Sequence, residues 1–160
     1  MADNEIYKID NANLPSQRPA WYWEGIIDLG EDTMGAWARI AFLAKLIISY
    51  PSEKWPSDEL WENLLPDWMK NQCPKMTRAE IECLLRKTPI DQQDDLPWEF
   101  GSWLEALRDR SWKWFGHELN GNTLHLVLEI TDIPPRIAAF KQIIIAAGGE
   151  IKNEIWVPSP

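Results

Sequence analysis

The stretch that decides the fold is SWKWFGHELNGNTLHLVLEI, residues 111–130. Two runs of alternating polar and apolar residues are joined there by Asn120, Gly121 and Asn122. An Asn-Gly pair between two such runs is the strongest short-range signal for a β-hairpin. The sequence therefore predicts two antiparallel strands.

The length of the hairpin loop decides where the two histidines of the chain point, because a slip of one residue turns every side chain to the other face. A three-residue loop would place Lys113 opposite Glu129 and His117 opposite His125. A two-residue loop would place the histidines on opposite faces. We expect the three-residue loop, because it collects the hairpin tryptophans with the leucines and forms a cross-strand ion pair.

A helix and a last strand follow the hairpin. Pro134 and Pro135 open an apolar-periodic helix that ends at Gly148 and Gly149, and residues 151–157 then read as a strand. Consecutive strands joined by a helix usually run parallel with a right-handed crossover. We therefore expect a ββαβ unit whose last strand lies parallel to residues 123–130.

The N-terminal part of the chain is predicted to be mostly helical. Residues 1–20 hold few apolar side chains and two prolines, which favours an irregular arm. Residues 21–29 suit a strand. Residues 34–50 form a helix that is apolar on nearly every side, so we expect it to run through the middle of the fold. Arg39 and Lys45 make it unsuitable as a membrane span.

Three further helices are predicted before the hairpin. Residues 57–71 begin at the capping residue Ser57 and must break at Pro66. Residues 77–87 begin with a Thr77–Glu80 capping box and carry an apolar stripe. A third helix covers residues 102–110. The polar, aperiodic stretch at residues 91–97 marks a boundary between a helical half and a mixed half.

Length and patterning together predict one α+β domain over residues 1–160. We expect an irregular arm (1–20), a mostly helical half (21–95) and an α-ββαβ half (96–160). The helical half should pack against the ββαβ unit, whose hairpin, crossover helix and parallel strand form a small mixed sheet.

The chain is acidic, with 16 basic and 25 acidic residues and a net charge of −9. Residues 51–100 alone carry −5. Such a surface repels phosphate backbones and anionic lipid, which argues against nucleic-acid and membrane binding and favours a basic protein partner. Two cysteines and an N-terminus without a signal peptide predict a cytoplasmic protein, for which a homo-oligomer is left open.

The sequence carries no pattern typical of catalysis. It contains no Gly-rich phosphate loop, HExxH or GxSxG motif. Cys73 and Cys83 are too far apart for a zinc knuckle and suit packing. His117 and His125 are weak metal candidates, because a site normally needs three or four ligands. We therefore predict no cofactor, no metal and no enzyme.

Eleven tryptophans are too many for a core of this size to bury completely. Those at positions 37, 112 and 114 are expected in the core, and those in the acidic middle segment at the surface. Exposed aromatic side chains rimmed by charge resemble interface hot spots. The predicted partner-binding residues are Trp55, Trp61, Glu62, Asp67, Trp68, Asp94, Asp95 and Trp98.

Three functions remain after these exclusions. The first is a non-catalytic protein whose acidic, Trp-rich middle segment docks a basic partner; toxin-neutralising immunity proteins share this physical profile. The second is a regulatory or small-molecule-binding module that uses the ββαβ unit and tryptophan walls. The third is an enzyme with dispersed catalytic residues.

Overall fold

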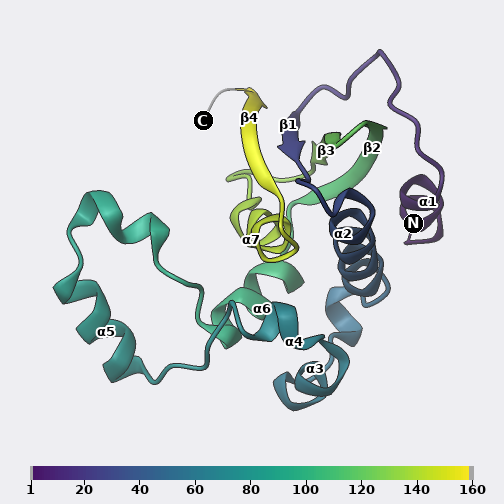
Figure 1. Cartoon of the computed structure of the whole chain (residues 1–160). Coiled ribbons are helices and arrows are strands. Elements are labelled where there is room, and N and C mark those ends of the chain that lie inside the picture. Colours follow the sequence, from purple (N-terminus) through teal and green to yellow (C-terminus); the bar gives the residue numbers. More distant parts are fainter. Residues whose placement is uncertain (1, 159–160) are drawn as a thin grey trace.

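A computed structural model describes residues 2–158, without the side chains of Ala2, Asp94 and Asp95. Four strands and seven α-helices follow one another in this described range (Figure 1). In chain order they are α1 (Ala2–Asp10), β1 (Tyr22–Asp28), α2 (Thr33–Ile48), α3 (Asp58–Leu64), α4 (Asp67–Lys70), α5 (Arg78–Lys87), α6 (Phe100–Arg108), β2 (Trp112–Asn120), β3 (Thr123–Ile130), α7 (Ala138–Ala146) and β4 (Glu150–Val157). Two short 3-10 helices, η1 (Ser52–Lys54) and η2 (Ile90–Asp95), flank the middle segment.

The strands form one antiparallel sheet in the order β2-β3-β1-β4. The class is α+β as predicted, but the expected parallel pairing of the last strand with β3 is wrong. β4 pairs with β1, which is antiparallel to both of its neighbours. β3 and β4 therefore run in the same direction without touching, because α7 carries the chain across β1.

The position of β1 also corrects the expected division into two halves. This strand comes from the N-terminal part of the chain, yet it lies in the middle of the sheet between two C-terminal strands. Its alternate residues Trp23 and Ile27 are fully buried. As a central strand it hydrogen-bonds to β3 on one side and to β4 on the other. The two parts of the chain thus share one sheet.

A β-bulge at Phe115 splits the hairpin into two registers. Before the bulge, Lys113 lies opposite Glu129, as expected. After it, His117 lies opposite Leu126 and Glu118 opposite His125, because Gly121 and Asn122 alone form the turn. The predicted pairing of the two histidines is therefore wrong. An extra residue in one strand reverses the facing of everything beyond it.

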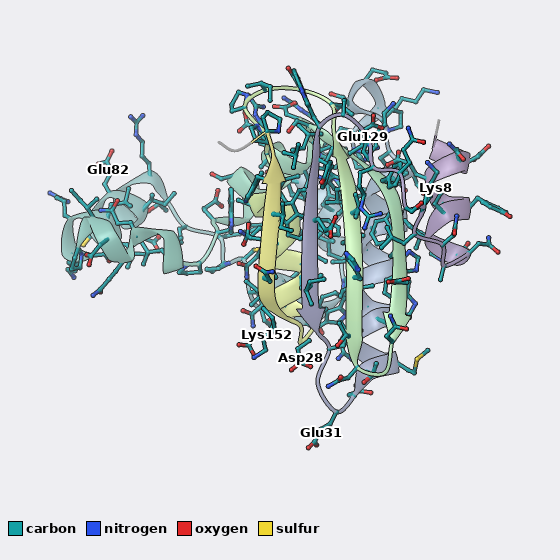
Figure 2. The ribbon with its side chains drawn as sticks, turned by 90° about the horizontal axis from the view of Figure 1, so that it is seen from above. Lys8, Asp28, Glu31, Glu82, Glu129 and Lys152 are labelled. Carbon is teal, nitrogen blue, oxygen red and sulfur yellow. The ribbon has the colours of Figure 1, made fainter. Side chains whose placement is uncertain are left out.

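One face of the sheet is covered by α2 and α7, and the other is open (Figure 2). The covered face contains the core, including Trp23, Trp112, Trp114 and Phe140, which are at most 1% exposed. Trp112 and Trp114 thus lie in the core as predicted, while Trp37 is half-buried. Part of the open face is crossed by the segment that leads from α1 to β1.

Residues 2–10 form helix α1, which corrects the expected irregular arm for this stretch, while residues 11–20 belong to no helix or strand, as expected. Ile9 is buried, and the carboxylate of Glu5 is buried with it. Both Glu5 oxygens accept hydrogen bonds from Arg110, at 3.0 and 3.1 Å, and one also accepts the backbone N–H of Trp114. These tertiary contacts anchor α1 to strand β2.

Helix α2 is not enclosed on all sides. Ile40, Leu43, Ala44 and Ile47 are buried, whereas Met34 is 68% and Phe42 50% exposed. We expected this helix to run through the middle of the fold. That expectation is wrong, because one side of the helix is exposed. No helix in residues 2–158 is long and apolar enough to cross a membrane.

The middle segment folds locally as its capping signals predict. Ser57 caps α3, and Pro66 separates α3 from α4. Thr77 and Glu80 form the capping box of α5. Helix α5 then stands away from the body of the molecule as an arm, in both views of the chain (Figures 1 and 2).

Candidate functional site

A groove with a volume of about 650 Å³ separates the α5 arm from the body of the molecule. Ile81, Leu84 and Leu85 of α5 form one wall. The opposite wall and floor come from the start of α6, from α7 and from the connection between α5 and α6. The other lining residues are Met76, Gln93, Leu96, Pro97, Trp98, Glu99, Ser102, Ala138, Lys141, Gln142 and Ile145.

Local sequence features strongly favour the α5 helix, whereas its tertiary contacts are weak. Its capping box and four-residue apolar spacing favour a helix even without packing. Prolines 74, 89 and 97 interrupt the connections on both sides and prevent the helix from extending. None of its residues is buried. Its apolar stripe therefore faces the groove and leaves the core to other elements.

Helix α7 presents opposite faces to the core and to the groove. Ala139, Phe140, Ile143 and Ile144 are buried against the sheet. The groove side carries Lys141 and Ile145, the latter 53% exposed. A surface helix of ordinary composition would have polar residues on this outer side. The groove side of α7 instead mixes polar and apolar side chains, and the exposed Ile145 is the large apolar one.

Several polar groups of the groove form hydrogen bonds within the chain. The two Glu99 oxygens accept the backbone N–H groups of Gly101 and Ser102 at 2.9 and 3.0 Å, which caps α6. Gln93 donates to the carbonyls of Leu85 and Thr88. The lining contains no histidine, cysteine or aspartate. The Ser102 hydroxyl lies 3.4 Å from a Glu99 oxygen that already caps α6, so the lining offers mainly a binding surface.

A second cavity of about 360 Å³ continues the groove past Trp98, Ala138 and Lys141, which line both. Trp156 and Arg136 lie on its far side. The two cavities therefore form one continuous concave surface along the outer side of α7.

Glu154 organises the rim of this second cavity. Its oxygens accept hydrogen bonds from Lys141 at 2.9 and 3.1 Å and from the indole nitrogens of Trp156 and Trp23 at 2.9 and 3.1 Å. Burial alone would raise the pKa of Glu154, but these donors and the Lys141 charge outweigh it and hold the pKa below its ordinary value. The carboxylate thus fixes both tryptophans and the lysine in place.

The predicted tryptophans do not form one exposed surface. Trp98 lies in the groove and is half-buried. Trp61 is completely buried, with its ring centroid 4.9 Å from that of Trp55, so its expected exposure is wrong. Trp55 and Trp68 are half-buried and pack against the core. The ring of Trp61 packs against those of Tyr50 and Trp55.

The predicted acidic residues lie in a different place from Trp98. Glu62 pairs with Lys75, and Asp67 lies 3.4 Å from Lys70. Glu62 also lines a separate cavity of about 370 Å³ with both lysines. The side chains of Asp94 and Asp95 lie outside the described residues. Part of the acidity of the segment is therefore neutralised by its own lysines.

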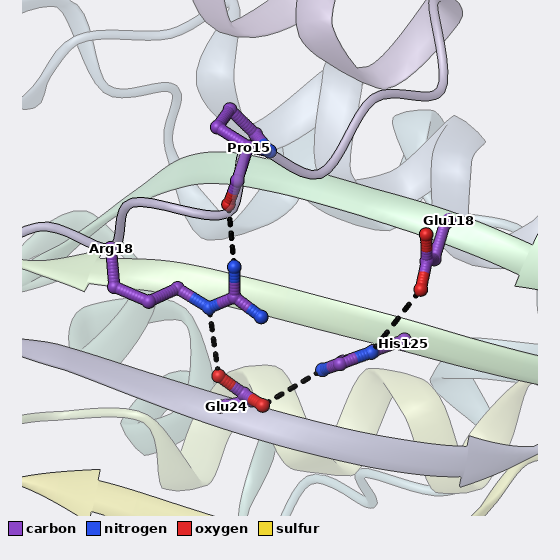
Figure 3. Close-up of polar contacts among 5 residues, drawn as sticks. All are labelled: Pro15, Arg18, Glu24, Glu118 and His125. Atoms are coloured by element: carbon purple, nitrogen blue, oxygen red, sulfur yellow. Dashed lines mark hydrogen bonds and ion pairs between the residues drawn. The ribbon is translucent and has the colours of Figure 1, made fainter.

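The two histidines occupy opposite faces of the sheet. Burial lowers the pKa of His117 to about 4, and its ring stacks on Trp37 with centroids 4.5 Å apart. His125 lies on the open face between Glu24, at 2.8 Å, and Glu118, at 3.5 Å (Figure 3). Among the described side chains no group of three or more His, Cys, Asp or Glu residues could hold a metal ion.

The open-face network extends to the segment that crosses it. Arg18 donates to Glu24 at 2.9 Å and to the carbonyl of Pro15 (Figure 3). Burial acts to raise the pKa of Glu24, yet the hydrogen bonds and charges of Arg18 and His125 lower it overall. These contacts hold the crossing segment against the sheet.

Neither cysteine is placed for nucleophilic chemistry. Burial, with the nearby charge of Glu99, raises the pKa of Cys73 to about 12. Cys83 is half-buried on the α5 arm. A thiol with so high a pKa is protonated at neutral pH and therefore packs as a small apolar group.

The groove residues that the sequence analysis missed are those of α7 and the α5 stripe. A signal for them was present: Ile145 interrupts the polar outer side of α7, and α5 is a short amphipathic helix between two proline-containing connections. No protein-family model, curated protein or solved structure matches this chain.

Proposed function

We propose that this chain is a non-catalytic binding protein that holds an apolar segment of a basic partner protein in the groove between α5 and α7. The observation that carries the proposal is the apolar stripe of α5, which faces a cavity of about 650 Å³ and contributes no residue to the core. Contiguous apolar surface of this kind marks interaction sites in other proteins. The second cavity would extend the contact along α7.

Charge supports a basic partner. The net charge of −9 includes −5 from residues 51–100, the segment that supplies the α5 wall and Trp98. Charge of one sign around an apolar contact accelerates association with a partner of opposite sign and excludes others. Toxin-neutralising immunity proteins are one class of small, acidic, non-catalytic binders with this profile.

The proposal is tested with a matched pair of leucine substitutions. Leu85 and Leu60 are both helical and 42% and 47% exposed, but only Leu85 lines the groove. The tagged chain is used to capture partners from a lysate of its source cells, and the captured protein is purified and titrated. Leu85→Asp should weaken its binding by about tenfold or more, which corresponds to about 1.4 kcal/mol. Leu60→Asp should leave binding unchanged.

The salt dependence of binding tests the electrostatic part of the proposal separately from the groove. Binding of a basic partner should weaken as ionic strength rises, because the Debye length shrinks from about 10 Å at 0.1 M to about 3 Å at 1 M. An affinity that does not change with salt concentration would contradict the electrostatic part of the proposal. Equal binding by Leu85→Asp and the unsubstituted chain would contradict the groove.

A small molecule is the alternative occupant of the same groove. Its volume falls within the range of roughly 300 to 1,000 Å³ that is typical of ligand pockets. Half-buried Trp98 forms part of the floor, so a bound metabolite should shift tryptophan fluorescence in the absence of any protein. Such a shift, abolished by Leu85→Asp, would favour this function over protein binding.

A further inference from the structure

The two edges of the sheet differ in how their outer backbone groups are paired. At the β2 edge, the backbone N–H of Trp114 donates to Glu5 at 2.8 Å, and that of His117 donates to the carbonyl of Asn13 at 3.1 Å. Residues 2–158 supply no such hydrogen bond to the outer backbone groups of β4, the other edge strand. An unpaired strand edge of this kind is a template for pairing with another chain.

A hydrogen bond at the start of β1 shows which of its backbone groups face β4. Ile130 donates its backbone N–H to the carbonyl of Trp21 at 3.0 Å, so Trp21 points toward β3. The direction of the backbone groups alternates along a strand. The odd-numbered residues of β1 therefore face β3, whereas Tyr22, Glu24 and Ile26 face β4.

The unpaired groups of β4 follow from this alternation. The β1 residues that face β4 lie opposite Asn153, Ile155 and Val157, which are therefore bonded to β1. Glu154 and Trp156 alternate with these three and direct their backbone N–H and C=O groups outward. We call these outward backbone groups the β4 edge. The side chains of the same two residues lie on the covered face, where that of Trp156 lines the second cavity.

The β4 edge therefore lies beside an apolar cavity. Its donors and acceptors repeat every second residue, which is the spacing that the backbone of another extended segment matches. The cavity has a volume of about 360 Å³, and Trp98, Ala106 and Ile137 supply apolar parts of its lining. An extended segment at this edge satisfies the backbone groups and offers alternate side chains to the cavity.

We infer that β4 pairs antiparallel with an extended segment of the partner protein, whose alternate apolar side chains enter the second cavity. This inference rests on the proposed function and adds the conformation of the bound segment. In an antiparallel pair, the residue opposite Trp156 exchanges two hydrogen bonds with it and directs its side chain to the same face. Parallel pairing would direct the side chains of the bonded residues to the open face instead.

The α5 arm makes a second copy of the chain a poor occupant of the β4 edge. Figure 1 shows the arm on the same side of the sheet as α6 and α7, and both views show that it projects past β4 (Figures 1 and 2). Two β4 strands paired antiparallel about a two-fold axis would set the covered faces of both copies on one side. The helices of the second copy would then meet the arm, whereas a single extended segment avoids it.

Amide hydrogen exchange, followed by NMR, tests the β4 edge directly. In the free chain the amide protons of Glu154 and Trp156 should exchange at least about tenfold faster than those of Asn153 and Ile155, which are bonded to β1. The probe is the end-blocked peptide Lys-Val-Lys-Val-Lys-Val-Lys, whose valines are apolar and whose lysines are basic. At saturation it should slow the exchange of the two outward amide protons by about tenfold or more.

Two methylated forms of this peptide form a matched pair. In the antiparallel arrangement the valines face the cavity, and their N–H groups donate to β4. Methylation of two valine nitrogens should therefore weaken binding by about tenfold or more, because it removes donors and adds bulk at the edge. Methylation of the two inner lysine nitrogens, which point away from β4, should leave the affinity unchanged.

Substitutions in the chain separate the second cavity from the groove. Ala106 is half-buried and lines only the second cavity, so Ala106→Phe should fill it and weaken peptide binding by about tenfold, with an unchanged circular dichroism spectrum. Leu85→Asp alters only the groove and should leave peptide binding unchanged.

Three results would each overturn the inference: outward amide protons that the peptide does not protect, equal binding of the two methylated peptides, or weaker binding of the lysine-methylated one. Failure of the proposed function is distinguishable from these results. It would appear as partner binding that Leu85→Asp does not weaken, whatever the peptide does at the β4 edge.

Discussion

The Nε1 atom of Trp114 donates a hydrogen bond to the Nδ1 atom of His117 at 3.2 Å, although the two residues are three apart on one strand. In a regular strand, residues three apart point to opposite faces. The bulge at Phe115 turns His117 toward the core, where it meets Trp114 and stacks on Trp37. A histidine that the hairpin pattern places on the open face is thereby buried.

Burial of His117 makes the stability of the fold depend on pH. Its pKa is about 4 in the folded chain and about 6.5 when unfolded, so the unfolded state takes up the proton first as pH falls. The contribution of the neutral His117 side chain to the free energy of unfolding is complete above about pH 6.5 and is lost as the pH falls toward 4. Urea unfolding should show a loss of about 2 kcal/mol between pH 6.5 and pH 5.

The control for this prediction is His117→Asn, whose side-chain oxygen can still accept from Trp114 but does not titrate. Its unfolding free energy should be lower throughout, since the ring stack on Trp37 is lost, and nearly flat across the same pH range. Glu24 and Glu154, whose pKa values are lowered, lose their stabilising charge only below this range. An equally steep pH dependence in the variant would show that another group is responsible.

Glu5 should be the residue on which α1 depends. Glu5→Ala leaves the Arg110 charge and the Trp114 N–H without their buried partner, which costs about 3 to 5 kcal/mol. Asp3→Ala, at an exposed position of the same helix, should change stability by no more than about 0.5 kcal/mol. Both values come from urea unfolding, and similar losses in the two variants would contradict the anchoring role of Glu5.

Two fully buried tryptophans should respond differently to the same substitution. Trp103 donates to the carbonyl of Ala139 at 3.0 Å, whereas Trp61 Nε1 has no hydrogen-bond partner among the described residues. Replacement by phenylalanine removes similar volume at both sites, but deletes an existing hydrogen bond only at the first. Trp103→Phe should therefore cost about 1 kcal/mol more than Trp61→Phe in thermal or urea unfolding. Equal costs would indicate that Trp61 has a partner, such as an ordered water.

Much of the local structure could be predicted from the sequence. The Asn-Gly turn, the capping box of α5, the break at Pro66 and the Lys113–Glu129 pair all depend on neighbours in the chain or on a single hairpin. Hydrogen bonds and side-chain spacing of this range are encoded within about ten residues. Because this pattern is local, the sequence shows the apolar stripe of α5 but does not show the groove that the stripe faces.

The candidate site was predicted less well, because exposure is a property of the whole packing. Trp98 was expected at the surface and lines the groove, while Trp61, in a similar acidic context, is completely buried. The residues next to Trp61 in the sequence do not indicate that its side chain fills a position in the core. The outer side of α7 contributes Ala138, Lys141, Gln142 and Ile145 to the groove, and the sequence of this helix does not indicate which element faces it.

By itself the sequence determined the elements: the hairpin, the crossover helix, the last strand and the capped helix of the arm. The tertiary structure alone decided that β1 enters the sheet between β3 and β4, that the bulge at Phe115 buries His117, and that Glu5 makes a helix of the first residues. The reason is physical: local periodicity sets which face of an element is apolar. Which element covers that face depends on contacts between residues up to about a hundred positions apart, such as Glu5 with Arg110.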